Sequence, residues 1–552
     1  MTELALLPAV WLMTGALLSA VLTGRAREGV ILLAPLLALW AVWQLPDGNL
    51  WSISYLGMTL EPLYADSLRR LFATVFCLMA FTGALFALRQ SAGRELSAAL
   101  AYAGGALGVC FAGDLFTLFL FWEVMAVFST LVIWCGGGDG ARQAGFRYAV
   151  LHFLGGVVLM AGIIWLGVES GSLSIRVLEL THPAAWLVLI GVLVNAAAPP
   201  FSAWVADAYP EASAGGSVFL SAFTTKTAVL VLMLLFPGTK LLIGVGLFMV
   251  FYGIVYALLE NDMRRILAYS IVNQVGFMVC AVGIGTGMAL NGAAAHAFAH
   301  IIYKALLLMS AGTVLWRTGR RKCTDLGGLY RSMPFTTACG IIGALAISAF
   351  PFTSGFVSKS LTSQAAADLS MTWVWLALTA ASAGVFLHAG IKFPWFVFFQ
   401  RDSGLRPADP PWNMRLAMGL FALLCIVLGC FPSLLYGLLP YPVDYRTYTA
   451  SHLVGQFQLL LFSGLAFFAL LPAMRRTLTI TLDFDWLYRV PLQRVVLGVG
   501  QLLEISRAAI GQGMVSLIDR LPSPERLAPV TAPAGGMLLV LLMVLIAGML
   551  LA

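Results

Sequence analysis

The chain contains 552 residues, of which 60% are hydrophobic and only 10% are charged, and its formal net charge is +7. Its apolar runs repeatedly exceed the roughly 18 mostly apolar residues that mark a membrane-spanning helix, which excludes a protein built mainly from soluble domains. We therefore predict an all-α polytopic membrane protein.

About sixteen such runs follow one another along the chain, and each predicts one transmembrane helix. In chain order they lie near 5–22, 29–46, 68–88, 95–112, 115–135, 146–168, 185–204, 216–236, 239–259, 264–286, 290–316, 335–359, 371–400, 414–438, 455–473 and 533–552. The first run has Glu3 where a secretory signal carries basic residues, so we interpret it as a retained helix.

Basic residues alternate between the two sides of the predicted membrane, and short cytoplasmic loops collect such residues. The loops after odd-numbered spans carry Arg25, Arg27, Arg89, Arg94, Arg142, Arg147, Arg264, Arg265, "RTGRRK" at 317–322, Arg401 and Arg406. One predicted cytoplasmic loop, "VADAYPEASAGG" at 205–216, is acidic instead. With sixteen spans both termini would lie on the non-cytoplasmic side, and this topology explains the net charge without a nucleic-acid partner.

The sequence gives no sign of a cofactor. Six of the eight cysteines fall inside predicted spans, and none has the C-x-x-C spacing of a metal or redox site. The chain also has no GxxxxGK[ST] phosphate-binding loop. We expect no cofactor and no metal, so the energy for any transport must come from an ion gradient or from a partner.

Several ionisable residues lie inside the predicted spans, where a charge costs at least about 2.5–3.5 kcal/mol and usually faces a polar pathway. They are Asp114, Glu123, His152, Lys226, His296, His300, Lys304, Lys359, His388 and Lys392. A buried lysine can be tuned to release its proton near neutral pH, whereas arginine cannot. The lysines are therefore candidate proton carriers, with snorkelling to the membrane surface as the alternative, above all for Lys392.

His296, His300 and Lys304 are spaced i, i+4 and i+8, which stacks them along one face of a helix. Such a column can pass protons through intervening waters, because imidazole titrates near neutral pH. Two other interpretations remain open, structural polar packing and a metal or haem site. The metal interpretation lacks a Cys, Asp or Glu nearby on that helix.

Spans 7 and 12 are interrupted in the same way, by "VNAAAPPFSAW" at 194–204 and "ISAFPFTSGF" at 347–356. Broken helices at membrane depth are tolerated when they are buried in protein or line a cavity, and a matching pair indicates internal repeats around a transport path. Five-helix units formed by spans 4–8 and 9–13 place both breaks at the same position. Because five is odd, the two units have opposite topology, which is an inverted repeat.

Five motifs now identify a resemblance that covers about residues 65–435. They are "GDLFTLFLFWE", "PPFSAWVADAYPEA", "RRILAYSIVNQVGF", "HAFAHIIYKALLLMSAG" and "DLGGLYRSMP…GFVSK". The chain resembles the antiporter-like proton-translocating subunits of Mrp-type cation/proton antiporters and of the complex I membrane arm, most of all the D-type Mrp subunits. The resemblance implies a fourteen-helix core with inverted repeats, and proton-carrying roles for Glu123, Lys226, His296, His300, Lys304 and Lys359.

One position departs from the family pattern. The family usually has a lysine at the head of the first broken helix, paired with the span-5 glutamate, and this chain has Asn195 there. An asparagine carries no proton. We interpret Lys226 as the nearest candidate partner for Glu123, and keep Asp114, Asn195, His388 and Lys392 as secondary candidates.

The remaining sequence suggests six segments. They are helices 1–3 in 1–94, the first repeat in 95–236, the second repeat in 237–400, helices 14–15 in 401–475, a cytoplasmic amphipathic or lateral segment in 476–530 and a last span in 531–552. Within the fifth segment, residues 494–520 alternate apolar and polar positions at helical spacing, which favours a helix on the membrane surface over a simple linker.

These observations predict a proton-translocating component of a multi-subunit Na⁺ or K⁺/proton antiporter in a bacterial inner membrane, with other membrane subunits and the lipid bilayer as its partners. Two alternatives stay open. The first is a proton-pumping component of a complex I-like or membrane hydrogenase redox complex, without a redox centre of its own. The second is the membrane partner of an inorganic-carbon uptake system.

Overall fold

The computed structural model describes residues 7–55, 57–472, 483–492, 494 and 498. Its contacts divide the chain into a large unit, within residues 1–53 and 59–481, and a small unit of 54–58 and 482–552. The described part of the small unit includes two short helical segments, α21 (Asp485–Leu487) and η6 (Tyr488–Leu492). Apart from residues 494 and 498, the predicted surface helix at 494–520 and the last span at 533–552 lie outside the described residues.

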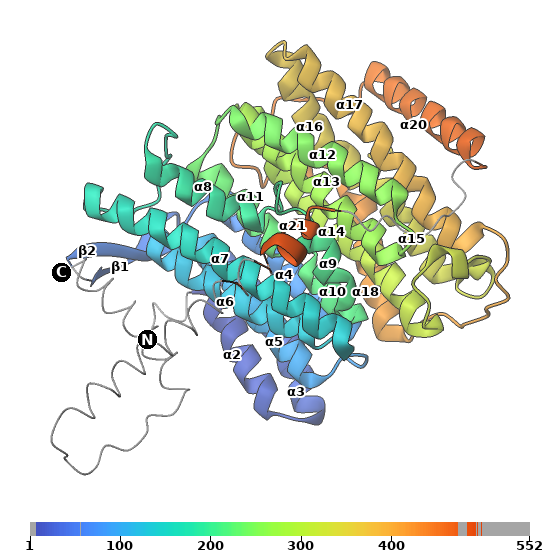
Figure 1. The fold of residues 1–552 in the computed structure, drawn as a ribbon, viewed down its shortest axis with the longest axis horizontal. Coiled ribbons are helices and arrows are strands. Elements are labelled where there is room, and N and C mark those ends of the chain that lie inside the picture. Colours follow the sequence, from blue (N-terminus) through green and yellow to red (C-terminus); the bar gives the residue numbers. More distant parts are fainter. Residues whose placement is uncertain (1–6, 56, 473–482, 493, 495–497, 499–552) are drawn as a thin grey trace. The chain divides into compact units, whose positions relative to one another are not determined.

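The chain begins with two helices, a small sheet and a third helix (Figure 1). These elements are α2 (Pro8–Val21), α3 (Gly24–Gln44), the two-stranded sheet of β1 (Gly48–Tyr55) and β2 (Met58–Ala65), and α4 (Ser67–Ala87). The spans predicted near 29–46 and 68–88 imply only a loop between α3 and α4. Asp66 ends this connection and caps α4, because its side chain accepts a hydrogen bond from the backbone N–H of Arg69.

The first five-helix unit contains two helices that are divided in the middle. Its elements are α5 (Gly93–Phe111), α6 (Leu115–Trp134), α7 (Gly138–Ser170), α8 (Pro183–Asn195), α9 (Trp204–Ala208) with η1 (Tyr209–Glu211), α10 (Ala214–Leu220) and α11 (Thr224–Leu235). The break after Asn195 was predicted. The break at 221–223, which divides the eighth span into α10 and α11, was not.

The second unit repeats this order. Its elements are α12 (Leu241–Leu259), α13 (Met263–Ile284), α14 (Gly287–Thr318), the short turns η2 (Cys323–Asp325) and η3 (Leu329–Arg331), α15 (Pro334–Ile347), α16 (Ser354–Asp368) and α17 (Thr372–Val385), which continues as π-helical turns in η4 (Phe386–Lys392) and η5 (Trp395–Phe399). Three further helices complete the large unit, α18 (Trp412–Cys430), α19 (Pro432–Tyr436) and α20 (Ala450–Leu470).

The lengths and breaks of the two five-helix units match closely. The third helix is the long one in both, with 33 residues in α7 and 32 in α14. The fourth helix breaks after 13 residues in α8 and after 14 in α15. Two residues beyond each break point an alanine adopts a left-handed backbone conformation, with φ of 60° at Ala197 and 55° at Ala349. The predicted repeat, with broken spans 7 and 12, is confirmed.

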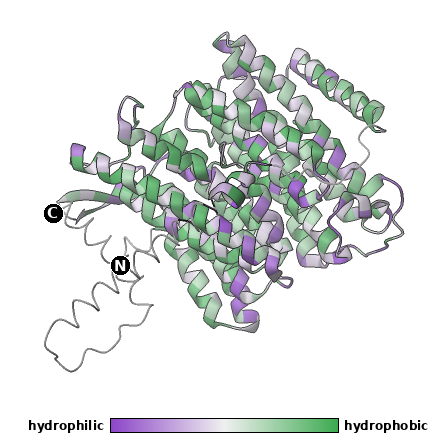
Figure 2. Cartoon of the chain, viewed as in Figure 1, coloured by the Kyte–Doolittle hydropathy of each residue, from purple (hydrophilic) through white to green (hydrophobic). Residues whose placement is uncertain are grey.

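Eleven helices of the described part are long and apolar enough to cross a membrane. Three further apolar helices, α2, α8 and α15, are shorter. Hydrophobic colour runs along most of their length in Figure 2. Fifteen of the sixteen predicted spans coincide with helices, and the sixteenth is not described. Helix α14 is central within the large unit, because it contacts α10 and α11 of the first repeat as well as α13, α15 and α16 of the second.

Candidate functional site

The central helix α14 places His296, His300 and Lys304 in one buried column, and each of the three side chains is at most 1% exposed. The ring centroids of His296 and His300 are 6.1 Å apart, as expected for two side chains one helical turn apart. The Lys304 ammonium donates hydrogen bonds to Ser270 Oγ at 2.9 Å and to the carbonyl oxygen of Leu267 at 3.3 Å, both on α13. The column predicted from the spacing is therefore present.

The imidazoles of this column keep free hydrogen-bonding capacity. His296 Nδ1 lies 3.3 Å from Ser358 Oγ. Its Nε2 and both ring nitrogens of His300 are buried without a hydrogen-bond partner in the described part of the chain. Buried polar atoms are usually satisfied by protein or by ordered water, so these nitrogens suit a site where protons pass through water.

Two lysines of the site bind backbone carbonyl groups at the broken ends of helices. Lys359, on α16, donates to the carbonyl oxygen of Ile347, the last residue of α15, at 2.7 Å. Lys226, on α11, donates to the carbonyl oxygen of Ser221, directly after α10, at 2.6 Å, and to Thr225 Oγ1 at 3.1 Å. The C-terminal carbonyls of a helix lack intrahelical partners and carry partial negative charge, so they stabilise an ammonium group.

Helix α14 brings elements of both repeats to the column, because it contacts α11, which carries Lys226, and α16, which carries Lys359. The Lys359 ammonium lies 5.1 Å from the centroid of the Phe277 ring, and this ring lies 6.0 Å from that of His296. The fold thus brings together five of the six site residues that the sequence predicted, namely Lys226, His296, His300, Lys304 and Lys359.

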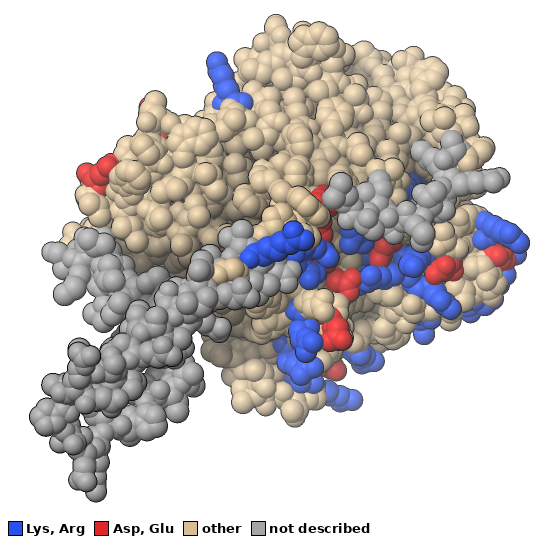
Figure 3. Space-filling model, viewed as in Figure 1, with Lys and Arg blue, Asp and Glu red and all other residues tan. Residues whose placement is uncertain are grey.

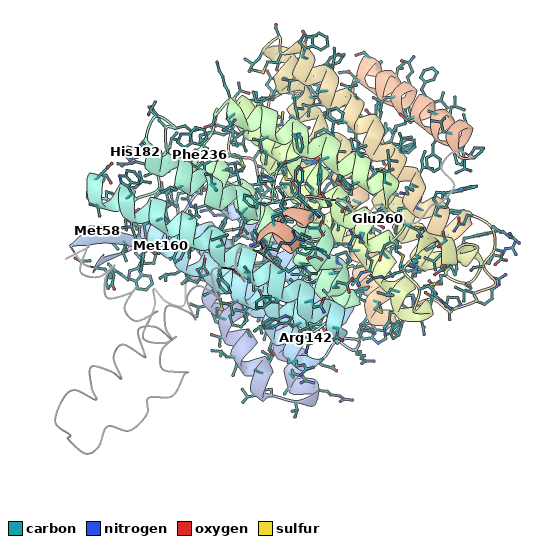
Figure 4. The ribbon with its side chains drawn as sticks, viewed as in Figure 1. Met58, Arg142, Met160, His182, Phe236 and Glu260 are labelled. Atoms are coloured by element: carbon teal, nitrogen blue, oxygen red, sulfur yellow. The ribbon has the colours of Figure 1, made fainter. Side chains whose placement is uncertain are left out.

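The π-helical turns of η4 carry the secondary candidates His388 and Lys392, and π-helical insertions occur often at functional sites. Lys392 is 2% exposed, so it does not snorkel to the surface. Its ammonium donates to three carbonyl oxygens at the end of α12, those of Ala257, Leu258 and Glu260, at 2.7, 2.6 and 2.7 Å. Glu260 is labelled in Figure 4. The His388 ring bonds the Gly384 carbonyl at 2.9 Å.

Glu123 lies apart from the lysines in this structure. It forms no ion pair with Lys226 among the described residues, and its buried Oε1 has no hydrogen-bond partner there. The carboxylate lies directly against Gly156 of α7, where a Cβ atom would overlap with it. The predicted pairing of Glu123 with Lys226 is therefore absent from this arrangement, because the Lys226 ammonium turns to the end of α10.

Asn195, the departure from the family pattern, has a partner that the sequence did not predict. The His152 ring, 1% exposed on α7, donates from Nδ1 to Asn195 Oδ1 over 2.7 Å. The ring also packs against Tyr148 and Trp204, with centroids 3.9 Å and 4.6 Å away. The sequence marks His152 as an intramembrane histidine, but only the fold brings it to the broken end of α8.

Asp114 acts as a structural cap. Its carboxylate accepts from the backbone N–H and the hydroxyl of Thr117, each at 2.7 Å, and from the backbone N–H of Glu61 at 2.8 Å. These bonds cap α6 and tie it to β2. Within the described residues no group of three or more His, Cys, Asp or Glu side chains is placed to hold a metal ion.

The acidic loop at 205–216 is neutralised by arginines from neighbouring segments. Asp207 accepts a forked pair of bonds from Arg147 at 2.7 and 2.8 Å, and Glu211 pairs with Arg321 at 2.9 Å. Arg321 also bonds Asp262 at 2.7 Å. Figure 3 shows charged side chains of both signs gathered in one zone of the visible face. The acidic loop at 205–216, which departs from the basic loop pattern, is thus part of an ion-pair network.

Comparison with known protein families gives a match over residues 112–384, to the family described as NADH:quinone oxidoreductase/Mrp antiporter, transmembrane. The probable A/B component of a K⁺/H⁺ antiporter of Rhizobium meliloti is 30% identical over 363 residues, 60% of this chain and 36% of that protein. The D component of the Na⁺/H⁺ antiporter of Alkalihalophilus pseudofirmus is 30% identical over 275 residues, 46% of this chain and 56% of the relative. The chain thus spans about a third to a half of these relatives.

Solved structures share the fold. A chain of the Mrp complex from Dietzia sp. DQ12-45-1b superposes with a TM-score of 0.71 at 22% identity, covering 82% of this chain and all of that one. A chain of respiratory complex I from Thermus thermophilus gives a TM-score of 0.69 at 23% identity, covering 83% of this chain and all of that one. At such identities the likeness concerns the fold alone.

Proposed function

We propose that this chain, which belongs to the NADH:quinone oxidoreductase/Mrp antiporter transmembrane family, is the proton-translocating subunit of a multi-subunit Na⁺ or K⁺/proton antiporter. It works in a bacterial inner membrane together with other membrane subunits. Protons move through Glu123, Lys226, His296, His300, Lys304 and Lys359.

One observation carries this proposal. Helix α14, which carries the buried column, contacts α11 of the first repeat, where Lys226 lies, and α16 of the second, where Lys359 lies. Titratable side chains at the centre of a membrane protein are expensive to bury and usually serve a transport path. A set of them on packed helices from both repeats supports a proton route through the middle of the molecule.

The partners of the lysines suit proton carriage. Lys226, Lys304 and Lys359 bond neutral carbonyl and hydroxyl oxygens rather than carboxylates. When an ammonium group in a buried salt bridge loses its proton, an uncompensated carboxylate stays behind, which is strongly destabilising. Neutral partners avoid this penalty, so these lysines can exist in both protonation states while the fold is maintained.

The second candidate is a proton-pumping component of a redox complex, of the complex I or membrane hydrogenase type. It is supported by the matched family, whose description names both classes, and by hydrogenase-4 component B of Escherichia coli, 28% identical over 359 residues. Membrane partnership in inorganic-carbon uptake is the remaining alternative. Co-purifying proteins distinguish these functions: small membrane proteins support the antiporter, and iron–sulfur or flavin proteins support the redox complex.

Lysine variants test the pathway in inside-out membrane vesicles that contain the whole complex. We expect Lys304→Ala and Lys359→Ala to abolish proton movement driven by added NaCl or KCl, while the complex still assembles. Lys304→Arg should also fail, because arginine keeps the charge but does not release its proton. The matched control is Lys240→Ala, since Lys240 is exposed at the start of α12. Normal transport in both alanine variants would reduce these lysines to structural groups.

A further inference from the structure

The two long helices of the repeats carry equivalent columns. Each ends at a glycine with a left-handed conformation, Gly171 after α7 and Gly319 after α14. His300 lies nineteen residues before Gly319, and His152 lies nineteen residues before Gly171. The same alignment places Tyr148 at the position equivalent to His296 and Gly156 at the position equivalent to Lys304.

This correspondence explains where the Glu123 carboxylate lies. The second repeat fills its third column position with the Lys304 side chain. The first repeat has Gly156 there, and the carboxylate of Glu123 reaches into the space from α6. Residues four apart share one face of a helix and are separated by about 6 Å along its axis. His152 is therefore the next column position from the Glu123 carboxylate.

We propose that His152 is a further proton carrier of the first repeat, next to Glu123, and that Asn195 positions its ring. Its Nδ1 is held by Asn195 at the broken end of α8, and its Nε2 is buried without a partner among the described residues. A hydrogen bond to one ring nitrogen fixes the tautomer and leaves the other nitrogen to accept the proton. This inference rests on the proposed function and deepens it.

Other charges near α7 are already compensated. The elements packed against α7 are α6, α8, α9 and η1, and their titratable side chains are Glu123, Asp207, Tyr209 and Glu211. Asp207 and Glu211 pair with arginines. On α7 itself the nearest titratable neighbour of His152 is Tyr148, which bonds Ser129 and Thr224. Glu123 is thus the carboxylate in this set to which the described residues offer no cation, and an imidazolium at His152 would supply one.

The first test is His152→Gln in the full complex, assayed in inside-out vesicles with acridine orange after addition of NaCl or KCl. Glutamine keeps a polar group toward Asn195 but does not titrate. We expect proton movement to fall by at least about tenfold, as for loss of a positioned acid–base group. His182→Gln, at the partly exposed start of α8, is the matched control and should transport as wild type.

A rescue separates proton carriage from a merely structural role. Adding Asn195→Lys to His152→Gln returns a titratable group to the end of α8. We expect this double variant to regain transport, with the alkaline limb of its pH profile at higher pH, because an ordinary lysine releases its proton at higher pH than an ordinary histidine. A double variant that assembles but stays inactive would overturn the role of His152.

A third variant leaves the histidine in place. Asn195→Asp is nearly isosteric and puts a carboxylate against the His152 ring, which favours the protonated imidazole and should move the pH profile toward alkaline values. An unchanged profile in this variant, or unchanged transport in His152→Gln, would refute the inference while the proposed function stands. Absence of cation-driven proton movement in the wild-type complex would instead refute the proposed function, and this inference with it.

Discussion

The contact between Gly156 and Glu123 predicts that a single added methyl group at position 156 impairs transport. In Gly156→Ala the new Cβ would lie 3.0 Å from Glu123 Cδ and closer still to Oε1. Ordinary contacts between non-bonded heavy atoms are about 3.5–4.0 Å, so the Oε1 atom must move by more than about 1 Å. Because these atoms are the far end of a flexible side chain, the fold can absorb the shift, and its consequence is a displaced carboxylate rather than a loss of stability.

We therefore expect Gly156→Ala to slow cation-driven proton movement by at least about tenfold, since a displacement near 1 Å at a reacting group can cost about 100-fold. The assay uses inside-out vesicles, with assembly checked by co-purification of the partner proteins. The control is Gly244→Ala on α12, where an added Cβ meets no atom within 4 Å. Transport at the wild-type rate in an assembled Gly156→Ala complex would refute the reasoning that the placement of the Glu123 carboxylate matters.

Two further predictions concern stability and orientation. Lys392→Met should lower the unfolding free energy by about 2–4 kcal/mol, because three carbonyl oxygens lose a charged donor. The melting temperature of the purified complex measures this loss. The control variant Lys240→Met should leave the melting temperature unchanged. A cysteine introduced at Arg320 should react with an impermeant reagent only from the cytoplasmic side, and one at Asn49 only from the opposite side. The reverse labelling pattern would overturn the predicted orientation.

Much of the fold was predictable because the length and apolarity of a membrane helix can be recognised in the sequence. The breaks in spans 7 and 12 were predictable too, since proline interrupts both runs. The break at 221–223 carries no proline or glycine, only "SAF", so no local signal marks it. The strands β1 and β2 were missed because residues 48–65 mix apolar and polar positions and are not apolar enough to predict a membrane span. The division into six sequence segments stays a prediction.

The site also has one part that the sequence predicts and one part that only the fold reveals. The column of His296, His300 and Lys304 follows from helical periodicity, which depends on one element alone. The partner of Glu123 depends on how α6, α7 and α11 pack, and sequence spacing does not report that. Gly171 and Gly319 are visible in the sequence, but their equivalence is not. The structure shows it, because each glycine ends the third helix of its repeat.

The two repeats differ in their charges, and this difference bears on how many protons the pathway holds. Helices α12 to α15 contain no Asp or Glu, and α16 has only Asp368, at its last residue. Two protonated rings at the 6.1 Å separation of His296 and His300 would repel by about 3 kcal/mol at an effective dielectric constant near 20. A second proton in this column is thus disfavoured by about 100-fold. In the proposed pathway, a proton that arrives at His300 therefore displaces a proton already held in this column. In the first repeat, the negative charge of the Glu123 carboxylate stabilises a separate proton.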